Sequence, residues 1–262
     1  MRRILISAIA FSVLPALVSA STETTWKMDP MVPNLNDKPS LQRGLTLFVN
    51  YCLGCHSLKF QRYERTADDL EIPHEIMIEN VIFTGQKIGS HMETAMSAEG
   101  AKAWFGAPPP DLTMVAKVRG AEWLYNYLRA FYVDDTRPLG VNNKVFENVG
   151  MPHALVELQG VPVEVPKQVP KMHPDGYELR DPLVPGKAIT EERLVLDVVE
   201  GTGKLTKAEY DQAVYDIVNF LYYVAEPARL DRERLGVYVL LFLVILYVFT
   251  ALLGREYSKE FH

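Results

Sequence analysis

The chain has 262 residues, carries 33 acidic against 27 basic side chains, and has a formal net charge of −6. An acidic chain of this kind is not expected to bind nucleic acid, because the phosphate backbone recruits basic surfaces. Its length allows one substantial domain with additional segments, and the sequence contains no internal repeat or low-complexity tract.

The N-terminus has the three parts of a secretory signal peptide. Two arginines precede an apolar run over residues 4–17, and Val18-Ser19-Ala20 supplies a small-residue cleavage site. Residues 1–20 are therefore predicted to be removed, which leaves 25 basic and 33 acidic residues and a net charge of −8. This negative charge could attract a basic soluble partner, or it could simply keep an acidic surface solvated. Residues 21–39 are predicted to form an extended arm.

The first firm helix is predicted over residues 40–52, with Ser40 as its N-cap. Apolar side chains recur along one face, at Leu41, Leu45, Phe48, Val49 and Cys52. Gly44 lies inside this helix, where glycine costs about 1 kcal/mol relative to alanine. A close crossing by another helix would explain it, and residues 206–225 are the best candidate.

Cys52-Leu53-Gly54-Cys55-His56 follows at the end of this helix and indicates covalent attachment of haem c. Each thiol can add to one vinyl group of the porphyrin, and His56 then lies beneath the iron as an axial ligand. These are the only two cysteines, so the second ligand pair of a structural zinc site is missing. A thioredoxin-type pair is also disfavoured, since no βαβ pattern flanks the motif.

The middle of the chain mixes one helix with irregular segments. A turn-rich stretch over residues 106–112 precedes a helix predicted over residues 121–131, whose aromatic side chains are assigned to the core. Residues 160–187 are rich in proline and are predicted to form a long irregular loop. A β-hairpin is then expected, with a strand over residues 193–200 and a turn at residues 201–203.

A second iron ligand decides whether the haem transfers electrons, performs catalysis or binds a gas. Met151 stands in Gly150-Met151-Pro152, where proline favours extended backbone before it and glycine permits a sharp approach. His153 is the strongest rival, and Met92, Met96 and Met114 are more easily explained as apolar gap fillers. Residue chemistry alone leaves this choice open.

Two helices are predicted at the C-terminal end. Thr206 and Glu209 form a capping box for a helix over residues 206–225, which Pro227 ends. Residues 235–254 carry no charge and would extend about 30 Å, the thickness of a hydrocarbon core. They are predicted to span the membrane as a stop-transfer helix, leaving residues 255–262 in the cytoplasm.

Several stretches together resemble the cytochrome c1 family, the membrane-anchored haem subunits of quinol–cytochrome c oxidoreductase, or bc1 complexes. The matching pieces are Arg43-Gly44 with Phe48, Cys55-His56-Ser57 with Tyr63-Glu64-Arg65, Pro109-Pro110-Asp111-Leu112-Thr113, Gly150-Met151-Pro152 and Ala225-Glu226-Pro227. They extend over nearly the whole mature chain. The resemblance implies a mainly α, class I cytochrome c-like haem domain over residues 21–230, with loop and hairpin insertions and one C-terminal transmembrane helix.

The resemblance also implies roles for individual residues. Cys52 and Cys55 hold haem c through two thioether bonds, and His56 and Met151 complete six-coordination of the iron. Pro109 and Pro110 pack against the porphyrin, and Arg119 lies near a propionate. The long proline-rich stretch after Met151 departs from shorter family members and has no assigned role.

The partners implied by the resemblance are those of a bacterial bc1 complex. The Rieske iron–sulfur protein would donate electrons, a periplasmic cytochrome c would accept them, and cytochrome b would pack beside the membrane helix in a dimeric multi-subunit complex. The haem domain would lie on the periplasmic side of the inner membrane. The acidic segment Asp68, Asp69, Glu71, Glu75 and Glu79 either steers a basic acceptor or is a solvated face.

Other functions remain open at this stage. A cytochrome subunit of a terminal oxidase would have the same haem chemistry in another complex. A membrane-tethered haem peroxidase or gas sensor would instead need a sixth position that Met151 does not fill.

Overall fold

The computed structural model describes residues 26–173 and 177–260, so the predicted signal peptide lies outside the described residues. The helices are α1 (Lys38–Tyr51), α2 (Tyr63–Leu70), α3 (His74–Asn80), α4 (Ala98–Phe105), α5 (Val115–Val118), α6 (Ala121–Arg129), α7 (Val156–Gln159), α8 (Lys207–Ala225) and α9 (Arg229–Glu260). Three antiparallel strand pairs complete the fold: β1 (Leu58–Arg62) with β2 (His91–Met92), β3 (Phe131–Val133) with β4 (Val141–Asn143), and β5 (Pro162–Pro170) with β6 (Thr190–Val198). The mainly α class with hairpin insertions is confirmed.

Helix α1 begins earlier than predicted, because its N-cap is Asp37. The Asp37 carboxylate accepts a hydrogen bond from the Ser40 backbone N–H at 3.0 Å, and proline stands in the first turn. Ser40 is fully buried and donates its hydroxyl proton to Asp216 at 2.6 Å. The prediction of Ser40 as N-cap was therefore wrong, because a serine near a helix start can instead bond across to another helix.

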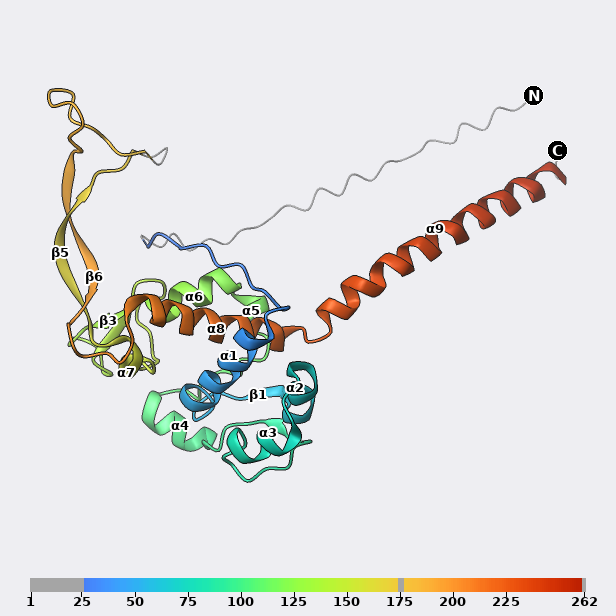
Figure 1. Ribbon diagram of the computed structural model, residues 1–262, viewed down its shortest axis with the longest axis horizontal. Helices are drawn as coiled ribbons and strands as arrows, with labels where there is room; N and C mark the ends of the chain where they lie inside the picture. The colour runs from blue at the N-terminus through green and yellow to red at the C-terminus, as the bar shows by residue number, and fades with distance from the viewer. Residues whose placement is uncertain (1–25, 174–176, 261–262) are drawn as a thin grey trace.

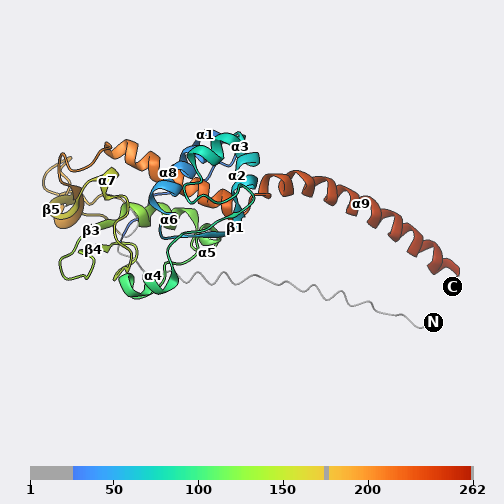
Figure 2. The same cartoon turned by 90° about the horizontal axis from the view of Figure 1, so that it is seen from below.

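Helices α1 and α8 cross and pack against each other (Figures 1 and 2). A Cβ atom at Gly44 would lie 2.1 Å from the carbonyl oxygen of Asp216 and 2.7 Å from the Cβ of Phe220. The rings of Phe48 and Phe220 pack next to this contact, 5.8 Å apart. The predicted crossing is confirmed, and it explains why glycine occupies the helix interior.

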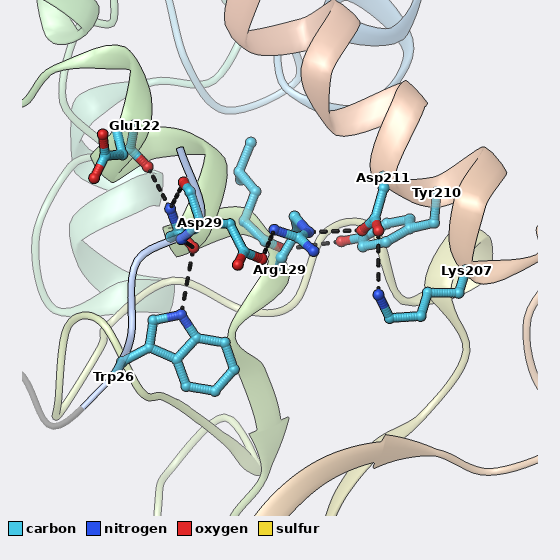
Figure 3. Close-up of polar contacts among 9 residues, drawn as sticks. Trp26, Asp29, Glu122, Arg129, Lys207, Tyr210 and Asp211 are labelled. Carbon is cyan, nitrogen blue, oxygen red and sulfur yellow. Dashed lines mark hydrogen bonds and ion pairs between the residues drawn. The ribbon is translucent and has the colours of Figure 1, made fainter. Parts of the chain in front are cut away.

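Helix α8 has the predicted capping box at Thr206 and Glu209. The first turns of α8 also help to anchor the N-terminal arm. Arg129, at the end of α6, lies between a carboxylate of the arm and a carboxylate of α8 (Figure 3). The Arg129 guanidinium is 2.8 Å from Asp29 and 2.6 Å from Asp211, and Tyr210 donates to the Leu128 carbonyl at 2.8 Å. The arm is thus tied to both α6 and α8.

The first part of the proline-rich segment, residues 162–170, is a strand rather than the predicted loop, whereas the described residues from 171 to 187 form turns and isolated bridges. Residues 162–170 of β5 pair in register with residues 190–198 of β6, and the hairpin projects from the body (Figure 1). Backbone bonds join Val199 to Val161 and Lys171 to Ile189, so the alternating pattern leaves Pro162, Pro166 and Pro170 with their nitrogens on the outer edge. Proline therefore removes no bond from this ladder, which is why its presence did not prevent a strand.

The chain does turn near residues 201–203, but the prediction of a hairpin turn there was wrong, because β6 pairs with the preceding strand β5. This segment lies at the root of the hairpin, where the chain returns to α8. A Cβ at Gly203 would lie 2.5 Å from the Gln159 carbonyl oxygen, and one at Gly160 would lie 2.6 Å from Val198. The two glycines allow the two ends of the excursion to pass in close contact.

Helix α9 contains the predicted span over residues 235–254 and extends away from the body at the end opposite the hairpin (Figures 1 and 2). Within the described residues it is the one helix long and apolar enough to cross a membrane, and its apolar window has no buried side chains. An apolar helix of this length, exposed on all sides, is expected in lipid rather than in water.

Candidate haem site

The end of α1 brings the thiols and the imidazole of the haem motif together. Cys52 is the C-cap residue of α1, and its carbonyl accepts the backbone N–H of Cys55 at 3.0 Å and of His56 at 2.8 Å. This tight turn follows the helix at once, so the three side chains line a common cavity.

His56 is held by the turn-rich stretch that the sequence indicates before α5. Its Nδ1 lies 2.8 Å from the carbonyl oxygen of Pro110, which can only accept, so Nδ1 carries the proton. Burial lowers the pKa of His56, although the Pro110 hydrogen bond opposes this shift. The imidazole is therefore neutral, and its Nε2 lone pair is available to a metal.

Two adjoining apolar cavities, of about 290 and about 210 Å³, surround these groups. Both are lined by side chains from α1, α6, the stretch before α5 and the loop that precedes α7: Cys52, His56, Pro110, Tyr127, Phe146 and Met151. Cys55 and Pro109 line the first cavity, and Arg119 and Trp123 line the second. The predicted haem residues thus meet at one place, although more than 90 positions separate the motif from Met151.

Met151 lines both cavities, whereas none of its rivals, Met92, Met96, Met114 and His153, lines either of them. His153 is buried, stacks on Phe131 with ring centroids 4.9 Å apart, and donates from Nε2 to Gln159 at 2.7 Å. Burial also lowers the pKa of His153 to about 4, so it is a neutral core histidine. Met92 is fully buried against Thr66, and Met114 is exposed at the start of α5.

Arg119 lies at the edge of the second cavity. Its guanidinium is 5.0 Å from the ring centroid of Trp123 and 5.8 Å from that of Phe146, and the side chain is otherwise exposed. A cation held over two aromatic rings at a cavity mouth suits a carboxylate such as a propionate.

Sequence reasoning missed the aromatic side chains of this site, because it assigned those of α6 to the core and gave no role to Phe146. Leu124 and Leu128 are indeed buried, but Tyr127 lines both cavities and donates its hydroxyl proton to Met151 Sδ at 3.4 Å. The prediction also extended this helix too far, because Phe131 begins β3. The pairing of Trp123 with Tyr127 at helical spacing was the available signal.

These residues fit haem c by the chemistry of the groups present. The site offers two thiols, a neutral imidazole with a free Nε2, and a thioether, within walls made of proline and aromatic side chains. A soft thioether and an imidazole are the axial pair of electron-transfer cytochromes.

The comparisons with known proteins point the same way. The family model of the Cytochrome C1 family matches residues 84–261, a range that contains Arg119 and Met151 and begins after the haem motif. A cytochrome c1 of Allochromatium vinosum is 45% identical over 229 residues, covering 87% of each chain. A cytochrome c1 of Rhodospirillum rubrum is 28% identical over 232 residues, covering 80% of this chain and 77% of that protein.

A further relative has a different name. The ammonia monooxygenase gamma subunit of Nitrosomonas europaea is 38% identical over 262 residues, covering the whole of both chains. The chain belongs to the cytochrome c1 family, whose members are membrane-anchored electron carriers with covalently bound haem c.

Proposed function

We propose that this chain is the electron-transfer subunit of a bc1 complex, with the iron of its haem c held between His56 and Met151. Haem c supplies one-electron cycling between ferrous and ferric iron when it is bound. The observation that carries the proposal is the shared cavity, which both thiols, His56 and Met151 line.

Each residue of the chain has a defined task in this proposal. Cys52 and Cys55 hold the porphyrin edge, and Pro110 orients His56 through the bond to Nδ1. Met151 would hold the iron as a protein ligand, which would leave no coordination site open to a substrate or gas. Pro109, Pro110 and the aromatic walls exclude water, which favours the reduced form, and Arg119 pairs with a propionate.

The Rieske iron–sulfur protein is the proposed electron donor and a periplasmic cytochrome c the proposed acceptor. The cleaved signal peptide would commit the haem domain to export, so residues 21–230 would lie in the periplasm and α9 would anchor them beside cytochrome b in the inner membrane. The cytoplasmic tail would begin at Arg255. Assembly into a dimeric multi-subunit complex follows from the same assignment.

The name of the Nitrosomonas relative supports a second candidate, in which a chain of this family serves a different oxidoreductase. The same haem site would then exchange electrons with the subunits of an ammonia-oxidising assembly. The match to the Nitrosomonas protein covers the whole of both chains, which supports this second candidate. No relative described above supports a terminal oxidase subunit.

Mild solubilisation and affinity purification of the full chain from its native membrane separates these candidates. Recovery of cytochrome b and a Rieske protein is the expected result. Recovery of monooxygenase or oxidase subunits in their place would overturn the assignment to a bc1 complex.

An optical titration tests the ligand pair independently of the partners. The ferric protein should show a far-red methionine–iron band that Met151→Ala removes, and the ferrous protein should bind carbon monoxide slowly. Rapid carbon monoxide binding by the native protein would instead support a peroxidase or a gas sensor.

A further inference from the structure

Tyr127 joins an aromatic wall of the site directly to a proposed iron ligand. Its hydroxyl lies 3.4 Å from Met151 Sδ, within the range of a hydrogen bond to sulfur. Both side chains line both cavities, so this contact lies at the boundary between them.

The ring of Tyr127 is fixed from two sides, so its hydroxyl has little freedom to turn away. It stacks on Trp123 with centroids 4.9 Å apart and planes 9° from parallel. Phe131 meets it edge-on at 5.3 Å and 66°. Such pairs contribute about 0.5–1.5 kcal/mol each beyond the area they bury, which favours this ring orientation over others.

The loop that carries Met151 is fixed to the same helix by Asn143. This side chain is fully buried and donates from Nδ2 to the Tyr127 carbonyl at 2.8 Å. Its Oδ1 accepts the backbone N–H of Val145 at 2.9 Å and of Phe146 at 3.1 Å. One amide therefore sets the start of the loop relative to Tyr127, and the contact between hydroxyl and sulfur is built from both sides.

We propose that Tyr127 is a positioning residue for Met151. Its hydroxyl orients the Met151 sulfur and lowers the strength with which this sulfur donates electron density to the iron. This inference rests on the proposed function. A thioether sulfur has two lone pairs, and the Tyr127 hydroxyl occupies one of them, which leaves the other for the iron. A hydrogen bond also withdraws electron density from the sulfur, and ferric iron depends on that density more than ferrous iron does.

The test compares Tyr127→Phe with the unaltered full-length protein, loaded with haem and solubilised in detergent. The substitution keeps the stacked ring and removes only the hydroxyl. We expect a lower reduction potential, because the sulfur regains the electron density on which ferric iron depends. The ferrous variant should also bind carbon monoxide with about three- to tenfold higher apparent affinity, which is the weight of one ordinary hydrogen bond.

Tyr125→Phe is the matched control, since it makes the same change on the same helix. Tyr125 packs under the Arg129 guanidinium, 4.4 Å from its ring centroid, and lines neither cavity. This variant should keep the native potential and carbon monoxide affinity. An equal change in both variants would show a general loosening of α6 and would overturn the inference.

The outcomes separate this inference from the proposed function. If the unaltered protein lacks the far-red band, the His56–Met151 pair is wrong and both fall. If the band is present and Tyr127→Phe leaves the potential and the carbon monoxide affinity unchanged, only the role of Tyr127 falls. Should the variant fail to take up haem, the unaltered ferrous protein gives the answer: the Met151 methyl NMR signal should shift between H₂O and D₂O, and a signal that does not shift would overturn the inference.

Discussion

The α1–α8 crossing and the β5–β6 hairpin differ in what holds them together. At the crossing, backbone meets backbone at Gly44, and the residues around it are fully buried. The hairpin is closed mainly by its main-chain ladder, and Leu194, Val198 and Asp197 on β6 stay exposed. The haem-binding body thus depends on close packing of α1 against α8, whereas the hairpin depends on the register of the hydrogen bonds between β5 and β6. The same kind of substitution should therefore have very different effects in the two regions.

The largest effect is expected from Gly44→Ala. The added methyl group would lie 2.1 Å from the Asp216 carbonyl oxygen, so α1 and α8 would have to move apart. Overpacking of a core costs about 1–3 kcal/mol and sometimes more, and contact with backbone places this site at about 3 kcal/mol. Chemical unfolding followed by haem absorption measures the loss.

Gly89→Ala is the control for that substitution, because its added methyl group would meet only Glu64 at an ordinary 3.7 Å. It should leave the free energy of unfolding nearly unchanged. A Gly44→Ala variant as stable as this control would mean that the crossing is not close-packed.

The next largest effect is expected at Asp216, whose carboxylate is buried within the crossing. It accepts hydrogen bonds from Ser40 at 2.6 Å, from Arg43 at 2.6 Å and from Gln212 at 3.0 Å. Asp216→Asn brings an NH₂ group towards these donors. Because Arg43 is about half exposed and keeps its hydration, the expected loss is about 2 kcal/mol rather than the larger cost of a fully buried pair.

An equivalent substitution in the hairpin sharpens the contrast. Asp197 pairs with Lys167 at 2.7 Å, but both side chains are about half exposed. Asp197→Asn should give no measurable change in the denaturation midpoint, whereas Asp216→Asn should lower it clearly. Equal losses would mean that burial does not distinguish the two regions.

The sequence predicted best where one local pattern has one physical explanation. The haem motif, the capping box at Thr206 and the charge-free span over residues 235–254 are of this kind. Gly44 was also predictable, because an unfavourable glycine inside a helix requires a close neighbour.

The sequence predicted poorly where the outcome depends on distant groups. Proline disfavours a strand only where its missing N–H would face the partner strand. The sequence of residues 160–187 alone does not show that β5 pairs with β6, or in which register. Residue chemistry could not choose between Met151 and His153, since the choice depends on Phe131 and Gln159, which occupy His153. The role of Tyr127 depends on a loop that begins beyond β4, so no local pattern predicts it.

A smaller, pH-dependent effect is expected where the body meets α9. Glu226 accepts hydrogen bonds from Lys117 and from Arg232, which lower the pKa of its carboxyl from 4.5 to about 2. A carboxyl whose pKa is lower in the folded than in the unfolded state stabilises the fold at pH values above its unfolded pKa. This contribution is lost as the pH falls through the folded pKa. Glu226→Gln should therefore melt below the unaltered protein at pH 7, and the gap should close between about pH 5 and pH 2.

Glu79→Gln, an exposed substitution on α3, is the control for the pH series and should leave the melting temperature at pH 7 nearly unchanged. Melting curves recorded by haem absorption at each pH provide the measurement. A gap for Glu226→Gln that is constant from pH 7 to about pH 2 would mean that the ion pairs do not contribute to stability.

The smallest effect on the body is expected from shortening the hairpin. Replacing residues 166–194 by Asn-Gly would join Val165 to Val195, a hydrogen-bonded pair in the register observed, through a turn that suits the twist of the strands. Within the described residues, the hydrophobic core has no buried member between Leu158 and Tyr210, so the unfolding free energy of the body should change by less than about 1 kcal/mol. The far-red band should also persist, because no residue removed lines the haem cavities. A loss as large as that of Gly44→Ala would mean that the hairpin contributes to the fold of the haem body, and the distinction between fit and register would fail.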